Sequence, residues 1–264
     1  MKISICVPVY NDVEGTKRLF ASIASQEYTD YEVIVSDDSN QSVTDKIKQL
    51  VEAFGEQFKY FRHLNSLGPA DNWNNCLNLA SGEFIKIMHQ DDFFVDEYSL
   101  RRFVDLLEKV PDCSIAFSGS KEVYQDYSYN RSISLKDEKR LNKNFRYLFF
   151  KNCIGAPSTT IFKSTNFRFD ERLRWFVDVD FYMALLQENP NYSFTHDSLV
   201  CIGHGAGQVT NSCIYNTQIL EYEGKILYEK FHLKSNVKYI LFYNFYICNH
   251  LLHLIRKLYH KIRR

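Results

Sequence analysis

The chain has 264 residues, of which 45% are hydrophobic and 24% charged, values that are ordinary for a globular protein. This length accommodates one large α/β domain, or one domain with a terminal extension. The 32 Lys and Arg residues balance the 32 Asp and Glu residues, so the net charge argues neither for nor against a nucleic-acid partner. Because the body of the chain has no basic face, we expect no such partner.

Seven cysteines are scattered along the chain without a Cys-x-x-Cys pair. This spacing argues against a zinc ribbon. Cys6 and Cys113 lie inside apolar runs, so we expect reduced thiols in the core of a cytoplasmic protein. The apolar run at the N-terminus is too short for a signal peptide and fits a strand better.

The first half of the chain alternates strand-like and helix-like segments. Apolar spacings of three and four predict helices. Strands that alternate with helices indicate an α/β fold with a mostly parallel sheet and right-handed crossovers. Strands are predicted at residues 3–9, 31–36, 58–64, 84–88 and 114–117, and helices at residues 14–26, 43–54, 71–80 and 100–110.

The second half is less regular. Residues 121–142 are polar and rich in tyrosine, which favours an excursion over the sheet. Strands are expected at residues 156–163 and 195–202, and a helix at residues 178–187. From about residue 213 the pattern is helical and ends in a basic, aromatic tail, so we expect a main domain over residues 1–210 and a helical extension over residues 211–264.

Acidic residues gather where predicted strands end. Residues 37–38 and 91–92 are both Asp-Asp pairs, and Asp178 and Asp180 lie near the start of a helix. In parallel sheets, ligands bind beyond the carboxyl ends of the strands. Adjacent carboxylates repel unless a cation or hydrogen-bond donors compensate, so such pairs suit a divalent metal. The same residues also cap helices, and that alternative stays open at this point.

Three blocks of sequence stand in an order that is typical of one enzyme family. Residues 3–11 form a strand that closes on Pro-Val-Tyr-Asn, residues 25–39 end in Ser-Asp-Asp-Ser, and residues 79–92 end in His-Gln-Asp-Asp. In this order and at this spacing they resemble glycosyltransferase family two, the large GT-A group of inverting enzymes. The resemblance covers about residues 1–210. It implies a Rossmann-like sheet flanked by helices, with its nucleotide-binding half at about residues 1–110 and its acceptor-binding half at residues 111–210.

The resemblance implies roles for individual residues in binding the donor. Pro8 and Tyr10 would line the pocket for the base and ribose. Asp38 would contact the nucleobase or its ribose. Asn74 lies where the family often has a polar residue near the nucleotide.

The third block carries the family's metal motif with one departure. His89 replaces the first acidic residue of this motif, whereas Asp91 keeps the position of the direct metal ligand. The resemblance implies that Asp91 binds Mn²⁺ or Mg²⁺ on the donor diphosphate. It also implies that His89 or Gln90 contacts the ribose, and that Asp92 supports this loop or helps to hold the donor sugar. His204, in a glycine-rich stretch that resembles the family's closing block, would bind the metal or a phosphate; a solvated side chain is the alternative.

A further block supplies the catalytic base. Trp-Phe-Val-Asp-Val-Asp at residues 175–180 resembles the family's Glu-Asp block at a helix start, with Asp178 in the position of the base and Val177 in place of the usual Glu. An acceptor hydroxyl is a poor nucleophile, and a positioned carboxylate takes its proton as the new bond forms. A metal neutralises charge on the departing diphosphate. The alternative is that Asp178 only caps the helix. Asp180, two residues further on, is expected to have a structural role.

These features predict a metal-dependent, inverting glycosyltransferase that moves a sugar from a nucleoside-diphosphate sugar, UDP-linked, to an acceptor hydroxyl. The resemblance suggests bacterial surface polysaccharide synthesis (O-antigen, capsule or lipopolysaccharide) with a saccharide or lipid-linked saccharide acceptor. Because His89 and Val177 depart from the family, a catalytically weak sugar-nucleotide-binding protein is the alternative. A Rossmann dehydrogenase is disfavoured, since no glycine lies between Met1 and Glu14 to form its phosphate-binding turn.

The C-terminal segment, residues 237–264, is predicted to be a basic, amphipathic helix. Its apolar residues recur at spacings of three and four, and Lys and Arg cluster at its end. We expect this segment to dock on the inner face of the cell membrane, with packing on the catalytic domain or on a second subunit as the alternative. Polar Asn and His residues interrupt the longest apolar stretch, residues 239–255, which argues against a membrane span.

Overall fold

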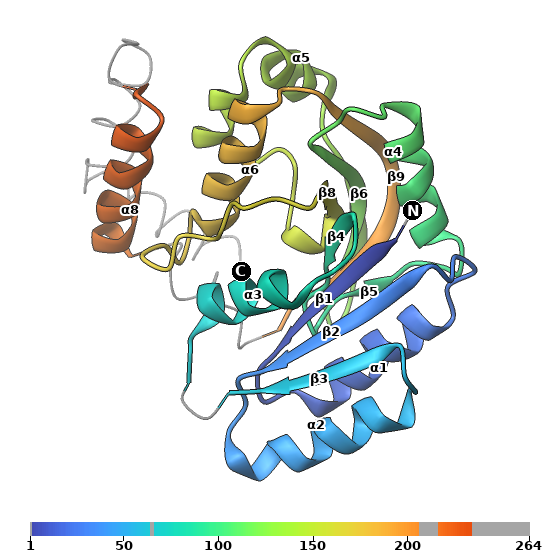
Figure 1. Cartoon of the computed structure of the whole chain (residues 1–264). Helices are drawn as coiled ribbons and strands as arrows, with labels where there is room; N and C mark the ends of the chain where they lie inside the picture. The colour runs from blue at the N-terminus through green and yellow to red at the C-terminus, as the bar shows by residue number, and fades with distance from the viewer. Residues whose placement is uncertain (1, 64–65, 206–215, 234–264) are drawn as a thin grey trace.

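The β-branched runs of the sequence form one mixed sheet with helices on both of its faces (Figure 1). The computed structural model describes residues 2–63, 66–205 and 216–233. Its strands are β1 (Ile3–Val9), β2 (Tyr31–Asp37), β3 (Phe58–Arg62), β4 (Phe84–Ile87), β5 (Phe93–Phe94), β6 (Ile115–Val123), β7 (Ser128–Arg131), β8 (Thr160–Lys163) and β9 (Tyr192–Gly203). Its helices are α1 (Val13–Ala24), α2 (Gln41–Ala53), α3 (Pro69–Leu79), α4 (Ser99–Lys109), α5 (Leu135–Lys143), α6 (Val177–Glu188) and α8 (Thr217–Lys230).

The sheet has a parallel half and a mixed half. Its strand order is β3-β2-β1-β4-β8-β6-β9-β5, with β7 added beside β6. Strands β1 to β4 pair in parallel, as the alternation of strand and helix predicts. β8 runs antiparallel to both β4 and β6, so it joins the two halves. The carboxyl ends of β1, β2 and β4 therefore lie along one edge, and ligands of such sheets bind beyond that edge.

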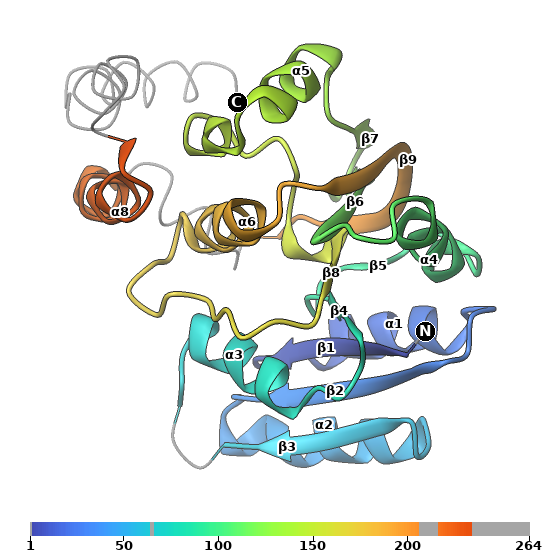
Figure 2. The same ribbon diagram turned by 45° about the horizontal axis from the view of Figure 1, so that its top comes forward.

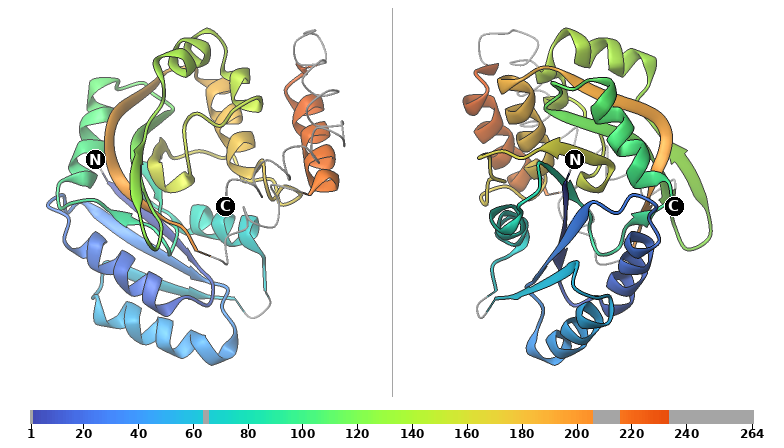
Figure 3. Two further views of the ribbon diagram at one scale, coloured as in Figure 1. Left: turned by 180° about the vertical axis from the view of Figure 1, so that it is seen from behind. Right: turned by 45° about the vertical axis from the view of Figure 1, so that its right-hand side comes forward.

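Two apolar cores lie on opposite faces of the sheet. One core holds α1, α2 and α4, with Phe20, Ile47 and Phe103 fully or almost fully buried. The other core holds α3, α6 and α8, with Cys76 and Met183 buried among aromatic side chains. Figure 1 and its rear view in Figure 3 show these helix groups on the two sides of the sheet.

Local sequence signals set the helix boundaries. Asp12 caps α1 because its carboxylate accepts a hydrogen bond from the Gly15 amide at 2.9 Å. Ser134 caps α5 in the same way, through the Asp137 amide at 3.2 Å. Helix α3 begins at Pro69, whose fixed φ suits the first helical turn. These signals confirm the predicted helices near residues 14–26 and 71–80 to within a few residues.

The region of residues 121–142 differs most from the prediction. Strand β6 continues to Val123, whereas the predicted strand ends at residue 117. A hairpin then leads into β7, and helix α5 follows. Because the outer strand of this hairpin is exposed, its sequence lacks the apolar alternation that marks a half-buried strand.

Helix α8 lies beside α6 in both views (Figures 1 and 2). This confirms a helix within the predicted extension. The predicted membrane-docking segment, residues 237–264, lies outside the described residues. Among the residues that the structure does describe, no helix combines the length and the apolar character needed to cross a membrane.

Candidate active site

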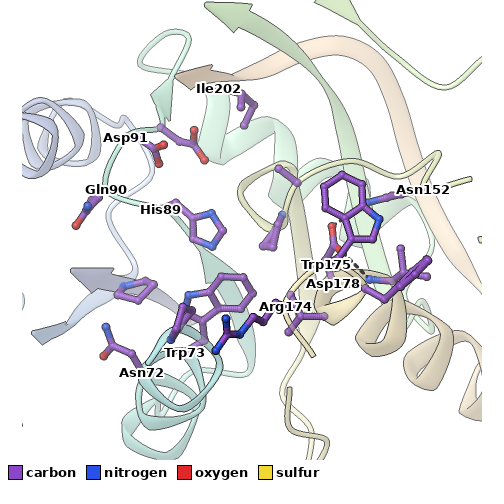
Figure 4. Close-up of a pocket in the computed structure, with 18 of the residues that line it drawn as sticks. Asn72, Trp73, His89, Gln90, Asp91, Asn152, Arg174, Trp175, Asp178 and Ile202 are labelled. Carbon is purple, nitrogen blue, oxygen red and sulfur yellow. Dashed lines mark hydrogen bonds between the residues drawn. The ribbon is translucent and has the colours of Figure 1, made fainter. Parts of the chain in front are cut away.

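A cavity of about 1220 Å³ opens at the edge where β1, β2 and β4 end. Residues that follow these strands line one side of it, and the start of α6 lines the other. Figure 4 shows His89, Gln90 and Asp91 on one side, with Asp178 and Trp175 facing the same space from the other. The cavity brings together most of the predicted site residues: Pro8, Tyr10, Asp38, Gln90, Asp91, Asp92, Asp178 and His204.

Tyr10 and Gln90 are locked together. The Tyr10 amide donates to the Gln90 side-chain oxygen at 2.6 Å, and the Gln90 side-chain nitrogen donates to the Tyr10 carbonyl at 2.9 Å. The loops after β1 and β4 are therefore joined by a pair of hydrogen bonds. The side-chain amide of Gln90 thus fixes this wall of the cavity, while Tyr10 stays 54% exposed.

Asp38 holds the loop that leads into α3. Its buried carboxylate accepts hydrogen bonds from the Leu67 amide at 2.9 Å, the Gly68 amide at 3.1 Å and the Ser66 hydroxyl at 3.0 Å. Gly68 has a φ of +81°, a conformation that glycine adopts at little cost. Asp38 therefore shapes the rim of the cavity at the predicted position of the nucleobase.

The structure does not bring Asn74 to the cavity. Its side-chain amide makes two hydrogen bonds of 2.8 Å with the backbone of Phe169, so it ties α3 to the segment before α6. Asn72 and Trp73 of the same helix line the cavity instead. The Asn72 amide is buried and bonds to Ser36 at 2.5 Å, while the Trp73 ring packs against His89 with centroids 4.7 Å apart.

A buried lysine in β4 stabilises the loop that follows this strand. Lys86 is fully buried, donates to the Ser158 carbonyl and lies 4.5 Å from the centre of the Phe103 ring. Burial lowers the pKa of its ammonium well below the usual value. The Ser158 hydroxyl in turn accepts from the His89 amide at 2.9 Å. These contacts fix the backbone from which His89 and Asp91 reach the cavity.

Asp92 supports the loop, as one of its two predicted roles requires. Its carboxylate is buried and accepts from the Gly203 amide at 3.1 Å, which ties the loop to the end of β9. Burial raises the pKa of this carboxyl well above its usual range. His89 Nε2 is also buried, and it has no hydrogen-bond partner among the described residues. An unpaired polar atom at a cavity wall is suited to a ligand.

A metal ion bound in this cavity would be coordinated by Asp91 and by the donor diphosphate. No three His, Cys, Asp or Glu side chains form a metal-binding group within residues 2–63, 66–205 and 216–233. His204 Nε2 lies 2.5 Å from the Glu122 carboxylate, and its ring stacks on Tyr124 with centroids 4.1 Å apart. Mg²⁺ is commonly held by one or two carboxylates plus substrate phosphates. Asp91 fits that mode, whereas metal binding by His204 stays a prediction.

Asp178 has the environment of a general base. It accepts hydrogen bonds of 2.8 Å from the Asn152 side chain and from the Val179 amide. Burial raises its pKa to about 6, against the lowering effects of these bonds and of Arg131. A carboxylate with this pKa is ionised at neutral pH and is a stronger proton acceptor than an ordinary Asp.

Helix α8 fixes the segment in front of Asp178. The buried Glu223 carboxylate accepts three hydrogen bonds of 2.9 Å from the amides of Arg174, Trp175 and Phe176. Asp180 of α6 is fully buried, and its carboxylate forms an ion pair of 2.7 Å with Lys230 of α8. The structure thus separates the two acidic residues of this block, because Asp178 lines the cavity and Asp180 anchors α8.

Sequence reasoning missed several residues of the site. Asn152 positions Asp178, Glu122 binds His204, and Glu223 holds the loop before α6. Each acts on a partner at least 26 positions away, so no local pattern marks it. The Ala-Pro-Ser block at residues 156–158 resembles a family loop and was the available signal for Ser158.

The sequence of the chain is similar to those of known glycosyltransferases. A family model described as "Glycosyl transferase family 2" matches residues 4–171. The GalNAc(5)-diNAcBac-PP-undecaprenol beta-1,3-glucosyltransferase of Campylobacter jejuni is 37% identical over 92 residues, which is 34% of this chain and 30% of that protein. The putative colanic acid biosynthesis glycosyl transferase WcaA of Escherichia coli is 26% identical over 215 residues, 80% of this chain and 76% of that protein.

Solved structures agree on the fold. Staphylococcus aureus TarS (residues 1–349) in complex with UDP-GlcNAc has a TM-score of 0.66 at 20% identity, covering 84% of this chain and 65% of that one. The mannosyltransferase PcManGT of Pyrobaculum calidifontis, with GDP-Man and Mn²⁺, has a TM-score of 0.59 at 16% identity, covering 83% and 61%. The chain therefore spans less than two thirds of each of these structures and about a third of the Campylobacter relative.

The expected GT-A fold is confirmed by these structural neighbours. The family model covers well over half of the 264 residues, and it includes the strands that carry Tyr10, Asp38 and Asp91 to the cavity. The chain belongs to glycosyl transferase family 2.

Proposed function

We propose that the protein transfers a sugar from a UDP-linked donor to an acceptor hydroxyl with inversion at the anomeric carbon. The observation that carries this proposal is a single cavity in which the Asp91 loop and the Asp178 carboxylate face each other. Binding of UDP-GlcNAc by TarS supports a uridine donor. Loops at strand ends supply the donor side, and the start of α6 supplies the base.

Asp178 would act on the acceptor. With a pKa of about 6, it is ionised at neutral pH and accepts the proton of the hydroxyl as its oxygen attacks the anomeric carbon. The Asn152 side chain and the Val179 amide hold its two oxygens in place. Attack from the face opposite the diphosphate inverts the anomeric centre. The leaving group is the nucleoside diphosphate.

Asp91 would hold Mn²⁺ or Mg²⁺ together with the donor diphosphate. The metal supplies neutralisation of the charge that grows on the leaving diphosphate. Asp91 projects from a loop that Lys86, Ser158 and Asp92 fix in place. His89 Nε2, unpaired among the described residues, is positioned to donate or accept a hydrogen bond at the donor.

The acceptor would be a saccharide or a lipid-linked saccharide used in bacterial surface polysaccharide synthesis. The names of the Campylobacter and Escherichia relatives, which refer to an undecaprenol-linked glycan and to colanic acid, support this assignment. A lipid-linked acceptor fits a cytoplasmic protein that docks on the inner face of the membrane. The basic pattern of residues 237–264 supports such docking.

Incubation of the purified chain with UDP-glucose, UDP-galactose and UDP-GlcNAc, with Mn²⁺ or with EDTA, tests the proposal. We expect at least one donor to be hydrolysed slowly without acceptor, and hydrolysis to stop in EDTA. Proton NMR of a transfer product made from an α-linked donor should show a β linkage. An α-linked product would contradict inversion, and full activity in EDTA would contradict a role for the metal.

The alternative is a sugar-nucleotide-binding protein with weak catalysis. His89 in place of the first acidic residue of the metal motif, and Val177 in place of the usual Glu, favour it. Binding of UDP-sugars without hydrolysis or transfer, under every metal condition, would select this alternative.

A further inference from the structure

Three tyrosines form an exposed aromatic surface at the tip of the β6–β7 hairpin. Tyr127 is 59% exposed and Tyr129 is 49% exposed, whereas large rings are normally buried. The Tyr124 amide bonds to the Tyr127 carbonyl at 2.9 Å, which closes the turn between the two strands. We call Tyr124, Tyr127 and Tyr129 the tyrosine platform.

The rings of the platform are nearly parallel. Tyr124 and Tyr127 stack with centroids 4.5 Å apart and an angle of 8° between their planes. Tyr129 lies 6.2 Å from Tyr124 at an angle of 16°. On Tyr124 the stack continues to the His204 ring, 4.1 Å away at 4°. Since the rings already hold one another in place, a ligand that packs on them loses little further side-chain entropy to order them.

The platform is continuous with the active-site cavity. Directly paired residues of two antiparallel strands point to the same face, and Glu122 pairs with Tyr129. Glu122, Tyr129 and Arg131 all line the cavity. Arg131 also donates to the carbonyl of Asn152 at 3.0 Å, the residue that positions Asp178. One face of the hairpin thus leads from the neighbourhood of the base to the exposed rings.

The platform lies away from the strands that carry Pro8 and Asp38. In the sheet, β6 is separated from β1 and β2, whose ends carry Pro8 and Asp38, by β4 and β8. Figure 2 shows β6 and β7 above the layer formed by β1 to β3. The cavity volume of about 1220 Å³ exceeds the roughly 300–1,000 Å³ that a single small ligand usually occupies, which leaves room for two substrates.

We propose that the tyrosine platform is a subsite for the acceptor saccharide, on which a pyranose ring packs by its apolar C–H face. This inference rests on the proposed function. The Tyr124 ring is already stacked between Tyr127 and His204, so the exposed rings of Tyr127 and Tyr129 offer the apolar area. Their hydroxyl groups at the edge can bond to sugar hydroxyls, which gives the amphipathic surface that a pyranose needs. Binding here would place the next hydroxyl of the acceptor toward Asp178.

Charge argues for a saccharide rather than a membrane as the occupant. Residues 121–131 contain two basic residues, Lys121 and Arg131, and two acidic ones, Glu122 and Asp126. A surface that binds anionic lipids is expected to carry an excess of Lys and Arg. The hairpin has no such excess, so its exposed rings suit a neutral, polar ligand.

The test uses the full chain and three probes: the methyl β-glycosides of glucose, galactose and N-acetylglucosamine. Binding is measured by saturation-transfer NMR, with the variants Tyr127→Ala, Tyr129→Ala and Tyr127→Phe. We expect at least one glycoside to bind through its axial C–H groups. Each Ala variant should weaken binding about tenfold, or about 1.4 kcal/mol, and the Phe variant should retain it.

Tyr98→Ala is the matched control, because Tyr98 is 51% exposed but lies outside the cavity. It should bind glycosides as the wild type does. Thermal unfolding identifies any variant that fails to fold, and Tyr127→Phe then carries the comparison with its ring intact. In a transfer assay, the Ala variants should raise the acceptor KM by a larger factor than they lower kcat.

Other outcomes would overturn the inference. These are an absence of saturation transfer from all three glycosides, equal binding by the Ala variants, or a loss of UDP-sugar hydrolysis in those variants, which would assign the rings to the donor. Loss of binding to phosphatidylglycerol vesicles in the Ala variants would assign them to a membrane. Failure of the wild type to bind or hydrolyse any UDP-sugar would instead refute the proposed function, while glycoside binding would still be measured separately.

Discussion

Replacing Asp178 with Asn should abolish catalysis and, at neutral pH, stabilise the protein. The raised pKa of about 6, against an ordinary value of 3.8, means that burial penalises the ionised form. A shift of this size corresponds to about 3 kcal/mol, which we reduce to about 2 kcal/mol because the carboxylate is partly accessible to water. Loss of a general base typically reduces turnover by about 10²–10⁴-fold.

The sign of the stability change follows from linkage. A carboxyl whose pKa is raised by folding favours the folded state below its unfolded pKa, and this contribution is lost as the pH rises through the folded pKa of about 6. Asp178→Asn removes the penalty, so it should raise the melting temperature by about 5 °C at pH 7.5 and much less at pH 4.5. The hydrogen bond that Asn loses to Asn152 or Val179 lowers both values alike.

Thermal unfolding at the two pH values and a pH–rate profile test this reasoning. Wild-type kcat should fall about tenfold per pH unit below pH 6, because the base must be ionised to act. Asp180→Asn is the matched control, since Asp180 lies two positions away and pairs with Lys230 instead of lining the cavity. Near-normal turnover in Asp178→Asn, or an equal stability change at both pH values, would refute the assignment. Asp180→Asn should reduce stability more than turnover. If instead Asp180→Asn loses turnover and Asp178→Asn keeps it, the alignment of this block is wrong by two residues.

Three further predictions concern the metal, the extension and the tail. Asp91→Asn should nearly abolish transfer and weaken donor binding in Mn²⁺, measured by calorimetry; a normal donor Kd and normal turnover would remove Asp91 from the site. Glu223→Gln should destabilise the protein by about 1–3 kcal/mol in urea, because the neutral amide leaves backbone donors of the loop unsatisfied; kcat should fall as well, and unchanged kcat would separate this loop from catalysis. A chain ending before Val237 should lose binding to anionic liposomes, at about 1 kcal/mol per basic residue removed; equal sedimentation of both forms would leave packing as the role of the tail.

The parallel half of the fold could be predicted because its signals are local. Buried strands such as Ile3–Val9 are continuous apolar runs, and the neighbouring helices have clear apolar stripes and capping residues. The hairpin of β6 and β7 could not be predicted, because an exposed strand with tyrosines on it has no apolar face to alternate. Its tyrosine rings are exposed, so no alternation of buried and exposed positions marks this strand in the sequence.

The site was predictable to the extent that its residues lie in sequence blocks with a recognisable order. Asp38, Asp91 and Asp178 could be named because each lies in a block with a recognisable order. Their partners could not, since Leu67, Asn152 and the other donors meet them only after folding. Asn74 shows the opposite case, because a polar residue at a promising position serves the backbone of Phe169.

The contact between Glu223 and the loop before α6 has a consequence for synthesis of the protein. A chain emerges from the ribosome N-terminus first, and its early segments begin to fold before the later ones exist. The parallel strands β1 to β4 are complete long before residue 223 appears. The three amides of Arg174, Trp175 and Phe176 have no carboxylate partner until that residue docks. The segment in front of Asp178 is therefore fixed only late in synthesis, once helix α8 has formed and docked.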